Sequence, residues 1–363
     1  MIPYIKDIIR MRRTFLVWAS ALFATGFFAQ GVQAQDNGYT RKVVVEELTG
    51  TACGWCPRGL VGMKMLREQF GDRFIGIAIH QFNATDPMYT SDYEEIDWSG
   101  DGSNGAPCCM MDRSGDIIDP FYGTAGNAGD VAKDFQSALS QPTSVGVTVS
   151  GTWNDDYTAV TATADITGDV AGKYGLVYVL IADSVTGNTT RWRQLNNYCG
   201  YTRDTFDDDR LAPFLKDGQY GQQGDYCKYV FEDVLVASSY KNYGTQYSKD
   251  IRNLADSVEI VPGVTTTTQP FVLTLPTQSP LKGAVQKARI GVIAMVIDPQ
   301  SGHVMNADKQ YMDLAPTTVR PVPVAGHAEQ GRYNVSGQRI AKPQQGLNLV
   351  RQADGTVRKE MVR

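Results

Sequence analysis

Two cysteines three positions apart are the residues of this sequence with the clearest capacity for chemistry. Cys53 and Cys56 lie in the stretch "TACGWCPRG", residues 51–59, and Pro57 follows the second cysteine directly. Such a pair can exchange electrons as a working dithiol, hold a loop as a structural disulfide, or supply half of a zinc site. Zinc would also need Cys108 and Cys109, and adjacent cysteines make a poor tetrahedral pair. We therefore expect no metal and no other cofactor.

The first 34 residues predict export from the cytoplasm. Four basic residues precede an uncharged, mostly apolar run at 14–29, which is shorter than the roughly 20 residues of a bilayer span. Val32-Gln33-Ala34 then supplies the small residues that signal peptidase requires. We predict a signal peptide at 1–34, with a retained N-terminal anchor as the alternative. All six cysteines lie in the mature part, so disulfides are expected.

The charge of the chain argues against one class of partner. The formal net charge is −5, and residues 1–34 carry four basic residues and one acidic residue, so their removal leaves −8. An acidic chain lacks the positive surface that nucleic acids require. We expect no nucleic-acid partner.

Residues 35–142 predict an α/β domain. A β-branched run at 41–48 is followed by helical apolar spacing at 57–70 and by an apolar strand at 73–82. Two short strands around a turn at 105–119 and a helix at 130–139 complete the unit. This order, with its Cys-x-x-Cys pair, resembles a thioredoxin-like domain. The resemblance implies that Cys53 is the exposed attacking cysteine at a helix N-terminus, where its thiolate is stabilised, and that Cys56 is the resolving cysteine.

Further residues match the thioredoxin-like pattern. Pro107, in "GAPCC", stands where these proteins have a cis-proline that faces the disulfide. Glu47 stands where they place a buried acid that accepts the proton of the resolving thiol; a solvated strand carboxylate is the alternative. Cys108 and Cys109 follow Pro107, and we consider either a redox relay with Cys53 or one buried and one unpaired thiol. For His80, a hydrogen-bonded structural role is favoured over a role in the site.

Residues 143–315 predict an all-β, immunoglobulin-like sandwich. Long β runs alternate with turns rich in Gly, Asn and Asp, without helical segments. Cys199 and Cys227 bracket a polar insertion, and we predict a structural disulfide between them, which would stabilise the fold by roughly 3 to 4 kcal/mol. The aspartates near 204–209 do not have the spacing of a calcium-binding EF-hand loop, and a solvated acidic loop is favoured.

The two-part order resembles one family of proteins. The segments "EELTGTACGWCPRG" and "IDPQSGHVMNADKQYM" are similar to those of the Omp-twenty-eight-related outer-membrane proteins of Gram-negative anaerobes. The resemblance covers most of residues 40–315. It implies attachment to the outer membrane or the cell surface, in some members with an adhesin-like role, and the strand pattern here is that of a sandwich and not of a membrane-inserted protein.

A separate C-terminal module follows a Pro-rich linker at 316–324. Residues 325–363 contain two hairpin signals, at Ser336-Gly337 and Asp354-Gly355. This small β module resembles the C-terminal sorting module of type IX secretion, with Tyr333, Gly337 and Gly346 in matching places. A degenerate module that no longer directs sorting is the alternative.

Two classes of function follow from the sequence. In the first, the protein is an exported thiol-disulfide oxidoreductase at the outer membrane or cell surface, or otherwise in the periplasm, and its partners are exported proteins with disulfides or thiols and the cell-envelope or secretion machinery. In the second, it is a non-catalytic, adhesin-like binding protein that uses the thioredoxin fold as a scaffold. The fold alone does not choose between them.

Overall fold

The computed structural model describes most of the chain after the predicted signal peptide. The described residues are 38–91, 98, 105–126, 129–239, 256–278, 280–312, 329–352 and 357–362. The predicted signal peptide and the predicted Pro-rich linker lie outside these ranges. Within them the chain is rich in strands, has few helices and forms several sheets.

The first part of the chain has the predicted order of elements, except that the second strand predicted at 105–119 is reduced to isolated bridges such as that between Cys109 and Ile118. It runs through β1 (Val43–Leu48), α1 (Pro57–Phe70), β2 (Phe74–Ile79), β3 (Cys108–Met111) and α2 (Val131–Leu139), with a short 3₁₀ turn at Gly71–Arg73. Pro57 is the first residue of α1, where no backbone donor is needed. The Asp130 side chain caps α2 by accepting a hydrogen bond of 2.9 Å from the amide of Ala132. Whether this unit is a thioredoxin-like domain stays a prediction.

Both helices cover one face of the first strands. Met63 and Leu66 of α1 and Phe135 of α2 pack with Val43 and Val45 of β1 in one buried cluster. Successive residues of a strand point to opposite faces, so Glu47, two positions after Val45, lies on the same face of β1 as Val45. The position of Glu47 beneath α1 follows from this alternation.

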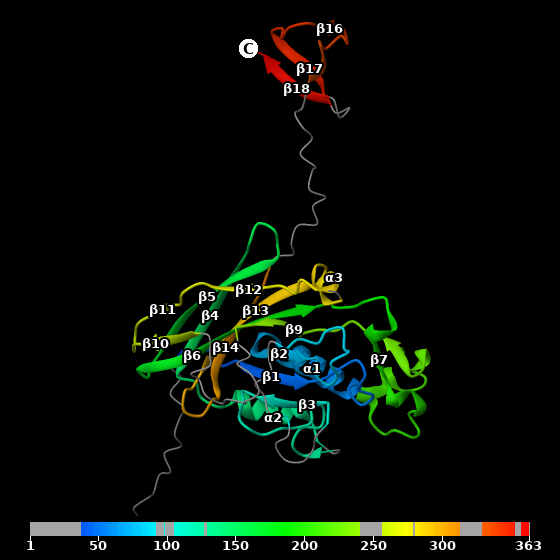
Figure 1. Ribbon diagram of the computed structural model, residues 1–363, viewed down its shortest axis with the longest axis vertical. Helices are drawn as coiled ribbons and strands as arrows, with labels where there is room; N and C mark the ends of the chain where they lie inside the picture. The colour runs from blue at the N-terminus through cyan, green and yellow to red at the C-terminus, as the bar shows by residue number, and fades with distance from the viewer. Residues whose placement is uncertain are drawn as a thin grey trace, which may run out of the picture. The chain divides into compact units, whose positions relative to one another are not determined.

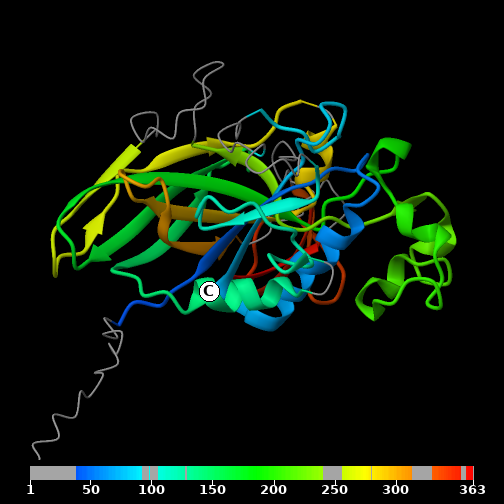
Figure 2. The same cartoon turned by 90° about the horizontal axis from the view of Figure 1, so that it is seen from below.

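One large sheet joins the first part of the chain to the second. Its strand order is β14 (Val304–Tyr311), β13 (Arg289–Ile297), β6 (Gly172–Asp183), β9 (Val234–Ser238), β2, β1 and β3, and β10 (Asp256–Ile260) also pairs with β6. Figures 1 and 2 show this sheet running through the molecule. The connection is the parallel pair β2 and β9, in register at Ala78 and Val234. The division predicted at residue 142 stays a prediction, and it would separate strands that share one sheet.

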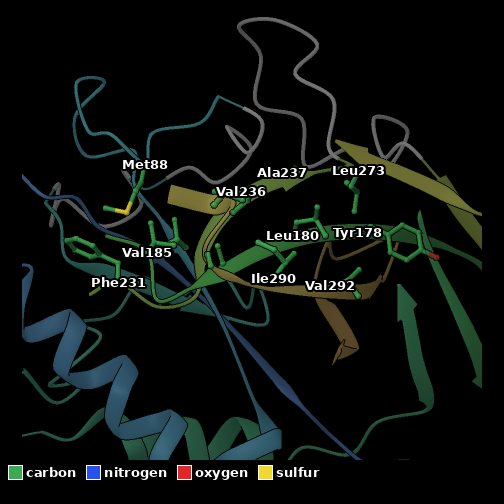
Figure 3. Packing of buried hydrophobic residues seen from close by; sticks show 14 of the residues in the cluster. Met88, Tyr178, Leu180, Val185, Phe231, Val236, Ala237, Leu273, Ile290 and Val292 are labelled. Atoms are coloured by element: carbon green, nitrogen blue, oxygen red, sulfur yellow. The ribbon is translucent and has the colours of Figure 1, made fainter. Parts of the chain in front are cut away.

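A second sheet packs on the large one. It contains β4 (Val145–Trp153), β5 (Ala159–Gly168), β11 (Thr266–Thr267) and β12 (Phe271–Thr274). Leu180 of β6, Val292 of β13 and Leu273 of β12 belong to the main buried cluster, which draws on both sheets (Figure 3). The short helix α3 (Leu281–Val285) adds two buried residues to it. Two facing β layers are therefore present, while the finer prediction of an immunoglobulin-like sandwich stays a prediction.

The apolar run at 227–238 is divided between two strands. Its start belongs to β8 (Tyr226–Lys228), which pairs with β7 (Arg193–Leu195), and its end forms β9. Asp233, just before β9, has a positive φ of 53° and a buried side chain that pairs with Arg67 of α1. A residue in the left-handed region interrupts the extended conformation of a strand. The apolar residues of this run do not predict that interruption.

The C-terminal residues form a sheet of their own. It has the order β16 (Arg339–Ile340), β15 (Glu329–Tyr333), β17 (Gly346–Gln352) and β18 (Val357–Val362). The hairpin predicted at Ser336-Gly337 joins β15 to β16, and Gly337 has the positive φ of 79° that such a turn requires. Strands β17 and β18 pair antiparallel on either side of the second predicted turn, which lies outside the described residues.

Candidate functional site

The Cys53 and Cys56 sulfurs are bonded to each other at the start of α1. The S–S distance is 2.16 Å and the two Cα atoms are 5.3 Å apart. A tight turn holds the loop, because the amide of Cys53 donates to the carbonyl of Gly50 and the amide of Cys56 to that of Cys53. The predicted pair therefore exists as a disulfide, and its redox role stays a prediction.

The loop before β3 approaches the disulfide from one side. The Ala106–Pro107 peptide bond is cis, as the resemblance implies. The carbonyl oxygen of Ala106 lies 3.3 Å from the Sγ of Cys53. This places Pro107 next to the disulfide, although the two segments are more than fifty residues apart in sequence.

Glu47 is fully buried beneath the first turns of α1. Its side chain is 1% exposed, and its Oε1 atom has no hydrogen-bond partner. A Cβ atom placed on Gly59 would lie 2.0 Å from that oxygen and 2.9 Å from the Cβ of Pro107, so the carboxyl, the helix and the cis-proline meet here. Burial, helped by the charges of Asp233 and Asp119, raises the pKa of Glu47 to about 8. The alternative of a solvated carboxylate is wrong.

A long insertion between β6 and β9 covers the disulfide. We call residues 190–228 the cap; it contains β7, β8 and 3₁₀ turns at Thr190–Trp192, Asn197–Gly200, Asp209–Phe214 and Gly221–Gln223. Its backbone is bonded to the cysteine loop: the amide of Leu195 donates to the carbonyl of Thr51 at 2.8 Å, and the amide of Asn197 to that of Gly54 at 2.9 Å. Figure 1 shows β7 beside the start of α1.

Side chains of the cap reinforce this contact. The buried amide Nε2 of Gln194 donates to the carbonyl oxygen of Cys53 at 2.8 Å. The ring of Tyr198 packs edge-on against Trp55, with centroids 5.2 Å apart. Trp55, the second residue between the cysteines, is nevertheless 42% exposed. Trp55 and Ala52 are the exposed residues of the loop at 51–56, whereas Cys53, Gly54 and Cys56 are buried.

The prediction that Cys53 is exposed is wrong. Its side chain is 3% exposed and that of Cys56 is fully buried. The cap covers the cysteine loop through Gln194 and Asn197, while the loop with Ala106 lies against the sulfur of Cys53. Access to the disulfide therefore depends on movement of one of these two segments.

Cys108 and Cys109 lie in the interior and are not part of the Cys53–Cys56 disulfide. They are 4% and 0% exposed and are adjacent residues of β3, so their side chains point to opposite faces. Cys109 pairs in register with Glu47 and packs in the cluster beneath the two helices. Burial, together with the charges of Glu47 and Cys108, raises the pKa of Cys109 well above its usual value. A raised pKa opposes formation of the thiolate. The redox relay of these two cysteines with Cys53 stays a prediction.

The predicted Cys199–Cys227 disulfide is not formed. Both residues are free thiols of the cap. The Sγ of Cys199 donates to a carboxylate oxygen of Asp225 at 3.2 Å, and the buried Sγ of Cys227 lies 3.6 Å from the carbonyl oxygen of Gln194. Backbone pairing of β7 with β8, in register at Gln194 and Cys227, fixes Cys227 on a strand, and the 3₁₀ turn directs Cys199 to another partner.

His80 is buried against Asp86, a residue that also contacts the cysteine loop. Its ring is 1% exposed, and its Nδ1 atom is 3.2 Å from the Oδ2 atom of Asp86. The same oxygen accepts a hydrogen bond of 2.6 Å from the amide of Thr51, at the start of the cysteine loop. His80 thus has the hydrogen-bonded structural role favoured above. Asp86 connects His80 to the cysteine loop.

Sequence reasoning missed three residues of this site. Gln194 and Asn197 lie about 140 residues after the cysteines, and Asp86 lies in a polar loop with no characteristic spacing. The Asp86-Pro87 pair indicates only a turn. The aspartates at 204–209 belong to the surface of the cap, where Asp208 pairs with Arg210.

The described part of the chain lacks a grouped metal-ligand set and a membrane-spanning helix. Among the described residues, no three His, Cys, Asp or Glu side chains are grouped so that they could hold a metal ion. No helix within the described ranges has the length and apolar character needed to cross a membrane.

Comparisons with known proteins give distant structural similarity. No protein-family model matches the chain, and no curated protein matches it in sequence. HBP35 of Porphyromonas gingivalis is 16% identical with a TM-score of 0.47, and the similarity covers 90% of this chain and 99% of that chain. Protein AGR_C_4864 from Agrobacterium tumefaciens is 15% identical with a TM-score of 0.38, over 77% of this chain and 97% of that chain. Neither similarity assigns a family or a function.

Proposed function

We propose that this protein is an exported thiol-disulfide oxidoreductase that works through Cys53 and Cys56. The observation that carries the proposal is the carboxyl of Glu47, which is buried, has an unpartnered Oε1 atom, and lies beneath the first turns of the helix that the disulfide begins. A buried carboxyl without a partner is costly, so a structural disulfide gains nothing from one. A redox-active dithiol must lose and regain a proton, and a buried carboxyl next to it can accept and return that proton.

The proposed exchange uses the two sulfurs in different roles. The Cys53 thiolate attacks a substrate disulfide, a mixed disulfide forms, and the distal substrate sulfur leaves as a thiolate. Glu47 removes the proton of the Cys56 thiol, and the resulting thiolate attacks Cys53, which releases the second substrate sulfur. The helix N-terminus favours the thiolate form of Cys53. With a pKa near 8, Glu47 can accept and return the proton close to neutral pH.

The cap determines which substrates this reaction can take. Because Cys53 is 3% exposed, a protein substrate reaches its sulfur only after the cap or the Ala106–Pro107 loop moves away. Exported proteins with disulfides or thiols are the proposed substrates. The exposed ring of Trp55 offers the first surface for contact with them.

A second function is favoured by the burial of both sulfurs. In this alternative the protein is a non-catalytic surface-binding protein, the disulfide is a staple at the start of α1, and the cap protects it. The hydrogen bonds from Leu195 and Asn197 to the cysteine loop fit such a permanent cover. The two functions differ in whether the disulfide can be opened in the folded protein.

Thiol trapping of the purified mature chain across a series of redox buffers tests the proposal. We expect the Cys53–Cys56 pair to titrate between about −120 and −270 mV, the range of known oxidoreductases, and a pair still oxidised below about −300 mV would establish the alternative. We expect Cys56→Ser to accumulate mixed disulfides with exported proteins, and Cys53→Ser to accumulate none. Cys199→Ser is the matched control and should behave as the unmodified protein does.

The place of action is part of the same proposal. We propose that the mature chain is attached to the outer membrane or the cell surface and that the C-terminal module engages the secretion machinery. The strands β15 to β18 pair among themselves, as expected of a module that folds separately and directs the protein to its location.

A further inference from the structure

Several buried polar atoms without hydrogen-bond partners belong to residues that line one pocket, Glu47 among them. Some buried side-chain nitrogen and oxygen atoms of the described residues have no hydrogen-bond partner. Four of them belong to residues that line a single pocket of about 480 Å³: Glu47 Oε1, Arg67 Nε, His80 Nε2 and Asp233 Oδ1. Buried polar groups in native proteins are almost always hydrogen-bonded to protein or water. A pocket of this size and polarity has room for several water molecules, at roughly 30 Å³ each.

The charges of the pocket nearly balance. The lining groups that carry or can carry charge, apart from Glu47 and His80, are Lys64, Arg67, Glu68, Asp183, Glu232, Asp233 and Arg289. Asp233 is paired with Arg67 and lies 3.7 Å from Lys309. Burial and the charge of Asp183 raise the pKa of Glu232 to about 7, so this carboxyl is partly neutral. The pocket has no strong excess of one sign to attract an ionic ligand, and water is the occupant that its groups favour.

His80 lines this pocket, and its Nε2 atom is buried without a hydrogen-bond partner. Burial alone raises the pKa of Asp86, but the charge of His80 and the hydrogen bonds from His80, Thr51 and Met88 together lower it below its usual value. Asp86 is therefore a carboxylate that accepts the Nδ1 proton of His80. This contact engages Nδ1 and leaves Nε2, a buried and unpartnered atom of a residue that lines the same pocket as Glu47.

We propose that His80 relays protons between the buried carboxyl of Glu47 and solvent through this pocket. The proposal rests on the oxidoreductase function proposed above and adds the route by which Glu47 regains or loses its proton. Glu47 is 1% exposed and needs such a route, because a carboxyl that cannot exchange its proton can act only once. Asp86 is the positioning residue, since it fixes the tautomer and the orientation of His80.

The relay balances when the disulfide is reduced. A thiolate of the reductant bonds to the Sγ of Cys53, the S–S bond breaks, and its electron pair stays on Cys56 as a thiolate. Glu47 gives its proton to that thiolate. The His80 imidazolium gives its Nε2 proton, through water, to the Glu47 carboxylate, and the neutral imidazole takes a proton from solvent at the open end of the pocket. Oxidation runs through the same steps in reverse.

The rate of disulfide reduction by dithiothreitol in the full mature chain tests the relay. The measurement covers pH 6 to 8, at dithiothreitol concentrations where the rate rises in proportion to concentration. We expect His80→Ala to reduce the rate about tenfold, and added imidazole to restore it with a pH dependence that follows the pKa of imidazole. His80→Gln, which keeps polar contact but cannot carry a proton, should be equally slow and insensitive to imidazole. His303→Ala, at an exposed position, is the matched control and should leave the rate unchanged.

Each outcome of this experiment supports or overturns the relay. Folding of every variant is checked by its circular dichroism and its unfolding midpoint. Folded His80→Gln with an unchanged rate overturns the relay while leaving the oxidoreductase function intact. The same holds if His80→Ala is slow but imidazole does not restore it. If the unmodified protein itself resists reduction until it unfolds, the oxidoreductase function fails, and the relay fails with it.

Discussion

The backbone amide of Asn197 donates a hydrogen bond of 2.9 Å to the carbonyl oxygen of Gly54, the first residue between the two bonded cysteines. This contact joins segments 143 positions apart and forms part of the cover over the disulfide. The side chain of Asn197 also fills the space that a side chain at Gly54 would need: a Cβ atom there would lie 2.2 Å from Asn197 Oδ1. The cap and the Cys-x-x-Cys loop are therefore fitted to each other residue by residue.

Gly54→Ala should loosen the cap. The new methyl group must displace Asn197, which weakens a backbone hydrogen bond worth about 1 kcal/mol together with the packing around it. We expect the disulfide of the folded variant to react with dithiothreitol about tenfold faster, which corresponds to ~1.4 kcal/mol. Gly200→Ala is the control, because a Cβ atom at this position of the cap meets nothing within 4 Å. Equal rates for both variants would show that the cap does not limit access.

Glu47→Gln should change how stability depends on pH. The folded pKa of about 8 is raised above the value of 4.5 in the unfolded chain, so the folded state retains a proton that the unfolded state releases. The stability that this group contributes is complete below pH 4.5 and is lost as the pH rises through 8. We expect the unfolding free energy of the unmodified protein to fall by about 5 kcal/mol relative to Glu47→Gln between pH 4 and pH 9.

Denaturant unfolding of both proteins at several pH values measures this difference. Glu68→Gln is the control, because it makes the same chemical change at a side chain that is 66% exposed. A constant difference between Glu47→Gln and the unmodified protein from pH 4 to pH 9 would mean that Glu47 is ionised in the folded state.

The thiols of the folded protein should differ in reactivity. Cys199 is partly exposed, whereas Cys108, Cys109 and Cys227 are buried, and burial raises the pKa of Cys227 to about 11. We expect maleimide to label Cys199 at least about tenfold faster than the other three in the native state. Without reductant, a denatured sample should take up four labels, and peptide mapping should find only Cys53 linked to Cys56. Recovery of Cys199 linked to Cys227 would contradict this arrangement.

Removal of residues 324–363 should leave the rest of the protein folded but change its location in the cell. The strands of the C-terminal sheet pair only with one another among the described residues, so the remainder should keep its unfolding free energy within about 0.5 kcal/mol. We expect the truncated protein to accumulate in the periplasm and to resist protease added to whole cells, unlike the full chain. Equal cleavage of both forms would show that the tail is not the address, and loss of folding would show that it belongs to the core.

The sequence by itself determined the local parts of this protein. Pro57 after Cys56, the apolar spacing of Leu60, Met63 and Leu66, and the β-branched run of β1 act over a few residues, and each formed the predicted element. The cis bond before Pro107 and the burial of Glu47 followed from the same resemblance to thioredoxin-like proteins.

The tertiary structure alone decided how these parts are covered and connected. The cap on the cysteine loop, the pairing of β9 with β2, the His80–Asp86 contact and the separation of Cys199 from Cys227 depend on backbone groups and side chains brought together by the whole fold. Every residue except proline has the same backbone amide and carbonyl groups. A backbone hydrogen bond such as that from Asn197 to Gly54 therefore gives no recognisable sequence pattern. Helical and strand periodicity reports which face of an element is buried, and it does not report which distant segment buries it.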